Sequence, residues 1–362
     1  MIKKSNTERV KEIVAALYYP VIAVVLALVI GAVVIAALGF DAGKAYASLL
    51  KGSLGSKNAL AETFIKATPL IFTGLSFAIG KRCGLINLGA EGQLFIGGLF
   101  ATFVGIYVTG LPIYLHLPLA LIAGFIGGGL YGLLAAWLKV KFGASELITT
   151  IMLNYIAINL ISYFVTGPMK EVGGDFPQTS PLAVTAQLPK LLPGTRLHAG
   201  IIVAILCIIF YYIFLWKTSK GYETRVVGLN AGAARYAGMN INKNALLAMF
   251  IAGGFAGLAG CSEIMGIQLR LFQNFSPGYG FDGIAVALLG NNTPIGIFVS
   301  GILFGILRSG SNMMQMTAQV PVSVVQIIQA LVILFIVGRE MFNFSKKIAL
   351  RKAAVAAAKG VK

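Results

Sequence analysis

The sequence has little charge and few of the side chains on which enzymes and metal sites depend. Only 11% of its 362 residues are charged, and it has 3 cysteines and 2 histidines. His116 and His198 have no carboxylate or cysteine nearby at metal-ligand spacing, and the cysteines have no obvious pairing. We therefore expect no metal site and no catalytic constellation in this chain.

Nucleotide-binding motifs are also lacking. G-x-x-x-x-G-K-[ST] does not occur, so we expect the chain not to hydrolyse ATP by a phosphate-binding loop. We also expect the chain to hold no cofactor. Gly278, Gly280 and Gly283 match G-x-G-x-x-G, but no predicted strand precedes them and an apolar segment follows. Since dinucleotide binding needs that strand, we expect these glycines only to make a tight turn before a helix.

The sequence is rich in apolar residues. Hydrophobic residues make up 57% of the chain, 44 residues are glycine, and the mean hydropathy is +0.85, which is typical of polytopic membrane proteins. Long apolar runs predict an all-α bundle, because a bilayer requires every backbone polar group to be paired within the protein. The net charge of +17 lies at helix ends and tails, without one interleaved patch, so we expect no nucleic-acid partner.

The apolar runs predict about ten transmembrane helices. The first, after a basic lead, is longer than the apolar region of a signal peptide, so we expect it to stay attached. The predicted spans are 17–39, 59–80, 85–108, 117–138, 146–166, 199–216, 245–266, 281–290, 294–309 and 321–338.

The eighth span decides the topology. If residues 281–309 formed one helix, nine crossings would put the basic C-terminal tail, 339–362, opposite the basic N-terminal tail, 1–16. We expect the helix to break within the region 281–294, at Asn291 to Pro294, which restores an even number of membrane crossings. Both termini then lie in the cytoplasm. Residues 281–290 are too few to cross alone, so we expect a short or broken helix buried among its neighbours.

Two loops interrupt the transmembrane domain predicted over 17–338. The outer loop, 167–198, has five prolines and either receives a partner or covers helix ends. The loop 217–244 is basic, and within it Asn230 can cap a short helix that ends at Gly238. Such a helix is too short to be stable alone, so it needs a partner surface. Its candidate partner-binding residues are Asn230, Ala233, Ala234, Arg235 and Gly238.

Polar side chains inside the spans are the candidates for contact with a solute, because they are costly in a membrane. Asn87 and Glu91 are four residues apart in the third span, and Thr150 and Asn154 continue a stripe that begins at Glu146 in the fifth. If these stripes face a third one, they line a path for a neutral, hydrogen-bonding solute. The alternative is that they only join helices. The third stripe comprises Gln319, Ser323 and Gln326 in the last span.

Four segments in order resemble a known family. They are GLINLGAEGQLFIGG from Gly84, ELITTIMLNYIA from Glu146, GYETRVVGLNAGAARYAGMN from Gly221 and ALLGNNTPIG from Ala287. Together they resemble the permease subunits of bacterial ABC importers in the branched-chain amino acid and simple-sugar superfamily, and most closely the nucleoside permeases. The resemblance runs from about residue 59 to 338.

The resemblance implies a type II importer-like fold, a bacterial inner-membrane location and nucleosides as the solute. It also implies a cytoplasmic ATPase that binds ATP and Mg²⁺, an extracytoplasmic binding lipoprotein, and a second, unlike permease subunit that makes a heterodimer. In such relatives the loop matching 221–240 carries the coupling helix that docks on the ATPase. Simple sugars such as ribose and branched-chain amino acids are alternative solutes, and an ATP-independent secondary transporter or channel is the alternative class.

Overall fold

The computed structural model describes residues 6–335 and 338, with side chains from residue 21 onward, and every regular element in these residues is a helix apart from three isolated β-bridges. The chain divides into two compact units. Residues 49–310 form the larger unit, and residues up to 48 together with those from 311 form the smaller one. The candidate sites described below lie in the larger unit, except for one polar stripe that lies in the smaller unit.

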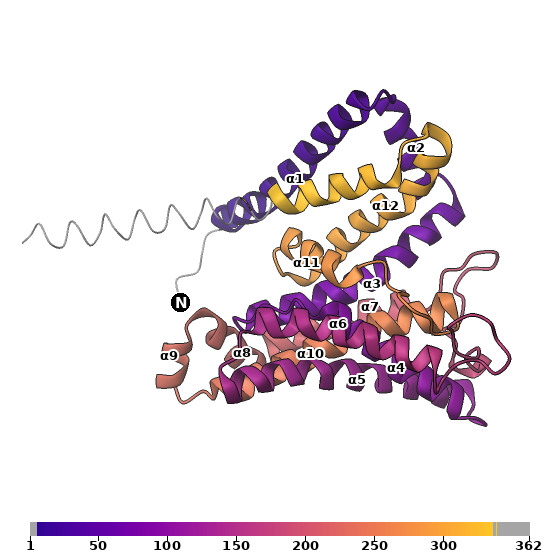
Figure 1. Ribbon diagram of the computed structural model, residues 1–362. Coiled ribbons are helices and arrows are strands. Elements are labelled where there is room, and N and C mark those ends of the chain that lie inside the picture. Colours follow the sequence, from indigo (N-terminus) through magenta and orange to yellow (C-terminus); the bar gives the residue numbers. More distant parts are fainter. Residues whose placement is uncertain (1–5, 336–337, 339–362) are drawn as a thin grey trace, which may run out of the picture. The chain divides into compact units, whose positions relative to one another are not determined.

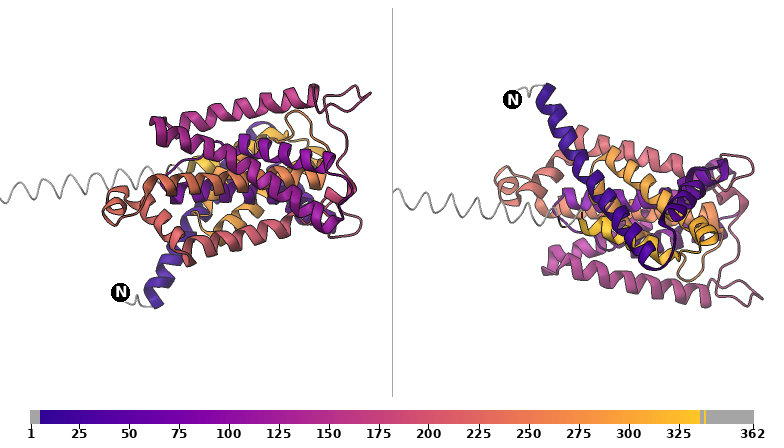
Figure 2. Two further views of the ribbon diagram at one scale, coloured as in Figure 1. Left: turned by 90° about the horizontal axis from the view of Figure 1, so that it is seen from below. Right: turned by 90° about the horizontal axis from the view of Figure 1, so that it is seen from above.

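The larger unit is a bundle whose long helices, α3, α4, α5, α6, α7 and α10, lie alongside one another (Figures 1 and 2). The short helices α8 and α9 lie at one end, which we call the α9 end, and the connection between α6 and α7 lies at the other, the far end. The helices are α3 (Lys57–Arg82), α4 (Ala90–Tyr107), α5 (Ile113–Phe142), α6 (Glu146–Thr166), α7 (Gly200–Lys217), α8 (Ser219–Leu229), α9 (Ala231–Tyr236), α10 (Ile241–Glu263) with its π-helical extension η2 (Ile264–Gln268), α11 (Tyr279–Leu289) and most of α12 (Pro294–Ala318).

The smaller unit contains α1 (Asn6–Ala37), the start of α2 (Ala42–Leu54), the end of α12 and the helix Val322–Phe335. Its helices pack closely: a Cβ at Gly31 would lie 2.5 Å from Ile328, and the Tyr46 hydroxyl donates to the Leu28 carbonyl at 2.6 Å. The N-terminal tail predicted over 1–16 is helical from Asn6, whereas the tail predicted over 339–362 lies outside the described residues.

Each predicted span corresponds to an apolar helix. Among the described residues, seven helices are long and apolar enough to cross a membrane, and Val21–Ala37, Tyr279–Leu289 and Val322–Phe335 are shorter. The predicted break is present, because α11 ends at Leu289 and α12 begins at Pro294. Asn291 and Asn292 both have positive φ, 50° and 52°, a conformation that asparagine tolerates better than most residues.

Small residues bring α5 and α10 into backbone contact. A Cβ at Gly128 would lie 2.4 Å from the Gly253 carbonyl oxygen, and one at Gly257 would lie 2.3 Å from the Gly124 carbonyl oxygen. Neither backbone can move aside as a side chain could, so this crossing requires glycine. The spacings Gly124–Gly128 and Gly253–Gly257 therefore serve helix packing.

The outer segment predicted over 167–198 packs on helix ends at the far end of the larger unit. Leu182 and Leu188 are buried, and their amides donate to the carbonyls of Leu269 and Met265, each at 2.9 Å. Burial lowers the pKa of His198, at the end of this segment, to about 4, so its imidazole is neutral at physiological pH. The segment thus covers helix ends, one of the two roles predicted for it.

We expect Gly128→Val to disrupt the α5–α10 crossing, because overpacking against a fixed backbone costs about 1–3 kcal/mol or more. The matched control is Ile126→Phe, which adds bulk to an exposed side chain of the same helix. The thermal midpoint of each detergent-purified variant measures the effect. Equal midpoints for Gly128→Val and the wild type would show that the crossing does not depend on glycine.

Candidate functional site

The loop predicted over 217–244 folds into two short helices at the α9 end. α8 is capped by Thr218, whose hydroxyl accepts from the Gly221 amide at 3.0 Å, and α9 is capped by Asn230, whose side chain accepts from the Ala233 amide at 3.0 Å. α9 ends at Tyr236, and Gly238 follows with φ +76°. The helix predicted from Asn230 to Gly238 is therefore present with the predicted cap and stop.

α9 turns one side toward its own chain and the rest toward solvent. Ala234 is fully buried against Cys83, Val227 and Ala248, whereas Arg235 is exposed and Tyr236 is 98% exposed. Of the residues predicted to bind a partner, Ala234 therefore packs internally, while Asn230, Ala233, Arg235 and Gly238 are exposed. The sequence did not single out Tyr236, which offers the largest exposed apolar side chain of the helix.

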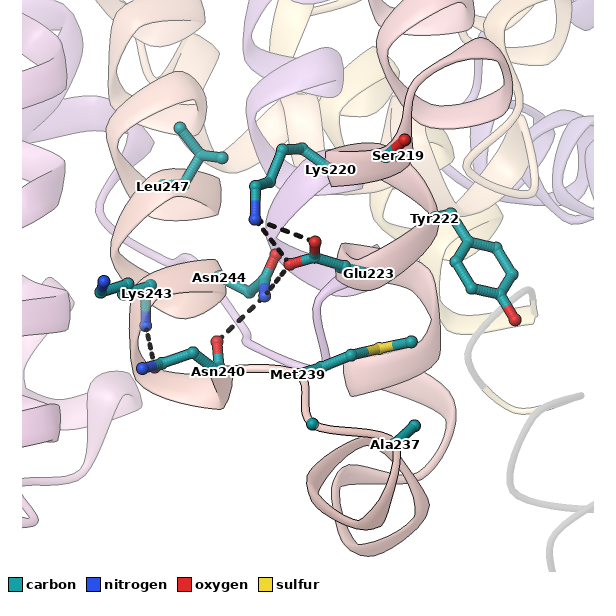
Figure 3. Close-up of a pocket in the computed structure, with 11 residues that line it drawn as sticks. Ser219, Lys220, Tyr222, Glu223, Ala237, Met239, Asn240, Lys243, Asn244 and Leu247 are labelled. Carbon is teal, nitrogen blue, oxygen red and sulfur yellow. Dashed lines mark hydrogen bonds and ion pairs between the residues drawn. The ribbon is translucent and has the colours of Figure 1, made fainter.

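A groove of about 550 Å³ separates α8 from the start of α10 (Figure 3). Glu223, Lys220 and Asn244 converge in it, while Tyr222 points away from them. The Lys220 ammonium lies 2.9 Å from the Glu223 carboxylate, and hydrogen bonds from Lys220 and Asn244 hold the pKa of Glu223 below its usual range. The groove therefore contains the Lys220–Glu223 ion pair of α8, which a hydrogen bond from Asn244 joins to α10.

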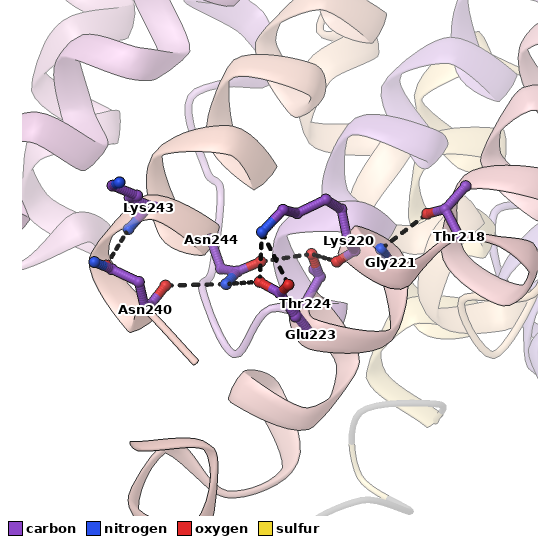
Figure 4. A network of polar contacts seen from close by, with 8 residues as sticks. All are labelled: Thr218, Lys220, Gly221, Glu223, Thr224, Asn240, Lys243 and Asn244. Atoms are coloured by element: carbon purple, nitrogen blue, oxygen red, sulfur yellow. Dashed lines mark hydrogen bonds and ion pairs between the residues drawn. The ribbon is translucent and has the colours of Figure 1, made fainter. Parts of the chain in front are cut away.

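Asn244 is the centre of the polar network that joins the two helices (Figure 4). Its side-chain amide donates to Glu223 at 3.0 Å and to the Asn240 carbonyl at 2.9 Å. Thr224 on α8 donates to the Asn244 side-chain oxygen at 3.4 Å. These bonds fasten α8 to the first turn of α10.

The loop also touches a second part of the bundle, just after α3. A Cβ at Gly228 on α8 would lie 2.1 Å from the Arg82 carbonyl oxygen, and one at Gly84 would lie 3.2 Å from the Gly228 Cα. Gly84 has φ +80°, which favours glycine for a second reason. From this contact, residues 85–89 run without helical structure into the bundle before α4 begins at Ala90.

Side chains satisfy the backbone of this non-helical stretch. Asn154 on α6 accepts from the Gly92 amide and donates to the Leu88 carbonyl, both at 2.8 Å, and Asn87 accepts from the Gly89 amide at 3.0 Å. Asn87 and Asn154 are both almost completely buried. Asparagine carries both a donor and an acceptor, so one side chain can pair with both kinds of orphaned backbone group.

Glu91 joins the start of α4 to the start of α11. Its carboxylate accepts from the Gly280 amide at 2.6 Å, and a Cβ at Gly280 would lie 2.2 Å from the Glu91 amide nitrogen. The positive φ of Gly278, +90°, and the absence of a side chain at Gly280 allow this approach, so the glycine motif makes a tight turn before a helix, as predicted. A carboxylate is favourable where two helix N-termini meet.

The predicted solute-contacting residues fall into two groups. Asn87, Glu91, Thr150 and Asn154 come together in the larger unit, are buried, and bond to the chain itself, Thr150 to the Glu146 carbonyl at 2.6 Å. Asn87 precedes α4, so the argument that it shares a helical face with Glu91 was wrong. The second group lies in the smaller unit, and its side chains are exposed in this chain. It consists of Gln319, Ser323 and Gln326.

A second polar group lies in the larger unit, and of its members the sequence singled out only Glu91. It surrounds the ring of Tyr279, which is fully buried at the start of α11, and we call it the Tyr279 cluster. The signal was available, because each of its charged residues interrupts an apolar run. Besides Tyr279 the cluster contains Lys66 on α3, Glu91 on α4, Glu263 on α10, Asp282 on α11 and Arg308 on α12.

Comparison of the sequence with known proteins shows the family to which the chain belongs. Residues 59–337 match the family model described as branched-chain amino acid transport system, permease component. The chain is 39% identical to the guanosine ABC transporter permease protein NupP of Bacillus subtilis, over 91% of this chain and 95% of that one. No solved structure shows a significant match.

Two further relatives are similar along nearly their whole length. The glucose ABC transporter permease protein TsgB13 of Haloferax volcanii is 38% identical, over 90% of this chain and 88% of that one. The nucleoside ABC transporter permease protein NupB of Lactococcus lactis is 34% identical, over 88% of this chain and 89% of that one.

Asn154→Ala should destabilise the bundle, because it leaves a buried amide and a buried carbonyl unpaired at a cost of about 1–3 kcal/mol each. The matched control is Asn159→Ala on the same helix, since Asn159 is exposed and donates only to the Tyr155 carbonyl. The thermal midpoint in detergent separates the two variants. If Asn154→Ala were as stable as the control but impaired in uptake, Asn154 would serve the solute and not the fold.

Proposed function

Because the chain belongs to the family of branched-chain amino acid transport system permease components, we propose that it forms the pathway of an ATP-driven importer of nucleosides. The observation that carries the proposal is the similarity to the guanosine and nucleoside permeases along about nine-tenths of the chain. Simple sugars are the first alternative solute, since a glucose permease is 38% identical, between the guanosine permease at 39% and the nucleoside permease at 34%. Branched-chain amino acids, which give the family its description, are the second.

The geometry at the α9 end supports a coupling role. α9 is a capped helix that exposes Arg235 and Tyr236, while hydrogen bonds and glycine contacts fasten its loop to α10 and to the segment after α3. We propose that a separate ATPase, which binds ATP and Mg²⁺, docks on α9 and moves these elements when it hydrolyses ATP. On this view the chain itself is not an enzyme.

The basic residues favour a cytoplasmic location for the α9 end. Lys81, Arg82, Lys139 and Lys141 lie at helix ends there, as do the basic residues of the 217–244 loop. An even number of crossings then places both termini on the same side, in the inner membrane of a bacterium. The far end faces outward, where Val172 and Val184 are 98% and 78% exposed. We propose the 167–198 segment at this end as the docking site of a binding lipoprotein.

A second, unlike permease subunit completes the proposed complex. Helices α5, α6 and α7 each expose large apolar side chains, among them Tyr155, Leu206 and Trp137. Lipid or a partner helix can cover such faces. A pathway between two permease chains requires that part of this surface contacts the second subunit. A heterodimer is our preferred arrangement, in line with the importers that the sequence resembles.

The energy source can be tested by uptake of a radiolabelled nucleoside into cells that express the chain with its partner subunits. We expect vanadate, which traps ABC ATPases, to abolish uptake, and a protonophore to leave the initial rate nearly unchanged while ATP is maintained. The opposite pattern would assign the chain to the secondary transporters. Parallel assays with ribose, glucose and leucine test the choice of solute.

Arg235→Glu combined with Tyr236→Ser should weaken binding of the ATPase at least tenfold and reduce uptake in proportion, because both side chains are exposed on α9 and neither packs within the chain. Binding is measured by co-purification at graded salt concentrations. Lys190→Glu, a charge reversal of an exposed residue at the far end, is the control for the binding measurement. Ala234 is unsuitable for this test, since its substitution would disturb internal packing.

A further inference from the structure

The Tyr279 cluster places ionic groups at membrane depth. Arg308 lies about 20 Å along α12 from Pro294, at 1.5 Å per residue, so it is far from the α9 end of a helix that is long enough to span a bilayer. Its guanidinium lies 2.7 Å from the Asp282 carboxylate, 4.7 Å from the centre of the Tyr279 ring and 3.1 Å from the Pro277 carbonyl oxygen. Three contacts therefore fix its position.

The members of the cluster differ in how much of each remains exposed. Glu91, Glu263 and Tyr279 are at most 5% exposed. The Asp282 and Arg308 side chains, in contrast, are 22% and 18% exposed. A charge facing lipid near the middle of a span costs about 2.5–3.5 kcal/mol on insertion scales. The exposed edge of this ion pair is therefore expected to meet water or another polar surface.

The two sides of α12 differ in what they face, which agrees with a polar environment for the exposed edge of the ion pair. Val299 is 59% exposed and lies nine residues before Arg308, which places it on the opposite side of a helix with 3.6 residues per turn. Gly301 and Gly305, on the side of Arg308, pack against Ile71 and Ala67 of α3. The Val299 side is apolar and suits lipid, whereas the side that carries Arg308 faces the bundle.

We propose that the Asp282–Arg308 pair lines the translocation path and binds the neighbouring hydroxyl groups of the solute's sugar ring. A carboxylate only accepts hydrogen bonds and a guanidinium only donates them, whereas each hydroxyl can do both, so two adjacent hydroxyls can span the pair. The inference rests on the proposed function, because nucleosides and simple sugars, its first two solute classes, share a ring with adjacent hydroxyls. It adds the residues that recognise this ring.

Water access is tested first, without any solute. Single substitutions Asp282→Cys, Arg308→Cys and Val299→Cys are treated in native membranes of the assembled complex with a charged methanethiosulfonate reagent, which needs an ionised thiol. We expect both cluster variants to react at least tenfold faster than Val299→Cys, with the wild-type chain as the blank for Cys83, Cys207 and Cys261. Equal rates at all three sites, with full labelling after denaturation, would overturn the proposal.

Recognition is tested by comparing uptake of a ribonucleoside with that of its 2′,3′-dideoxy analogue. The binding protein is the same in every assay, so a change in the uptake ratio reports on this chain. We expect Asp282→Asn and Arg308→Gln to lower the ratio about tenfold, since a hydrogen bond to a charged group is lost. Arg308→Lys keeps the charge, so its uptake ratio should lie between that of Arg308→Gln and that of the wild type. Equal losses for both solutes would show a purely structural role and overturn the proposal.

The control is Lys139→Gln, which breaks an ion pair with Glu146 whose side chains are 35% and 17% exposed. It should leave the uptake ratio unchanged. The two proposals fail separately: a wild-type complex that transports neither nucleosides nor sugars refutes the proposed function, whatever the thiol labelling shows. Uptake with an unaltered ratio in Asp282→Asn and Arg308→Gln refutes only the role of the ion pair.

Discussion

The larger unit depends on one constraint, which is that backbone groups carried into a membrane-spanning bundle without helical structure must find hydrogen-bond partners in the protein. Residues 85–89 break the helical pattern between α3 and α4, and Asn154 pairs with the backbone on either side of the start of α4. Glu91 does the same for the first turn of α11. The burial of Asn87, Asn154 and Glu91 is therefore explained by the backbone groups that they pair with, before any solute is considered.

This constraint also makes the bundle mechanically continuous. Gly228 of α8 lies in backbone contact with Arg82 and Gly84, where the non-helical stretch begins, and Glu91, just beyond its end, holds Gly280. Asn244 supplies a parallel connection to α10. On the proposed coupling role, a displacement of α9 would reach the start of α11 through these backbone contacts and hydrogen bonds. A loop tethered only by flexible side chains would absorb the same displacement.

The sequence predicted what local rules control, namely the apolar helices, the break before Pro294 and the Asn230 cap. It did not predict what depends on contacts between distant segments. Helical spacing predicted that Asn87 and Glu91 share one face. A spacing of four residues puts two side chains on the same face only within a helix, and Asn87 precedes α4. Asp282 and Arg308 are far apart in sequence, and only the packing of α11 beside α12 makes them a pair.

Burial then separates two uses of polar groups in the same bundle. An amide such as Asn154, which already bonds to an amide and a carbonyl of its own chain, can bind a solute only by giving up those bonds, at a cost of about 1–3 kcal/mol for each buried group left unpaired. The Asp282–Arg308 pair keeps an exposed edge while its contacts to Tyr279 and Pro277 hold it in place. A fixed but accessible ion pair can therefore bind a passing solute without disturbing the backbone pairing that the buried amides maintain.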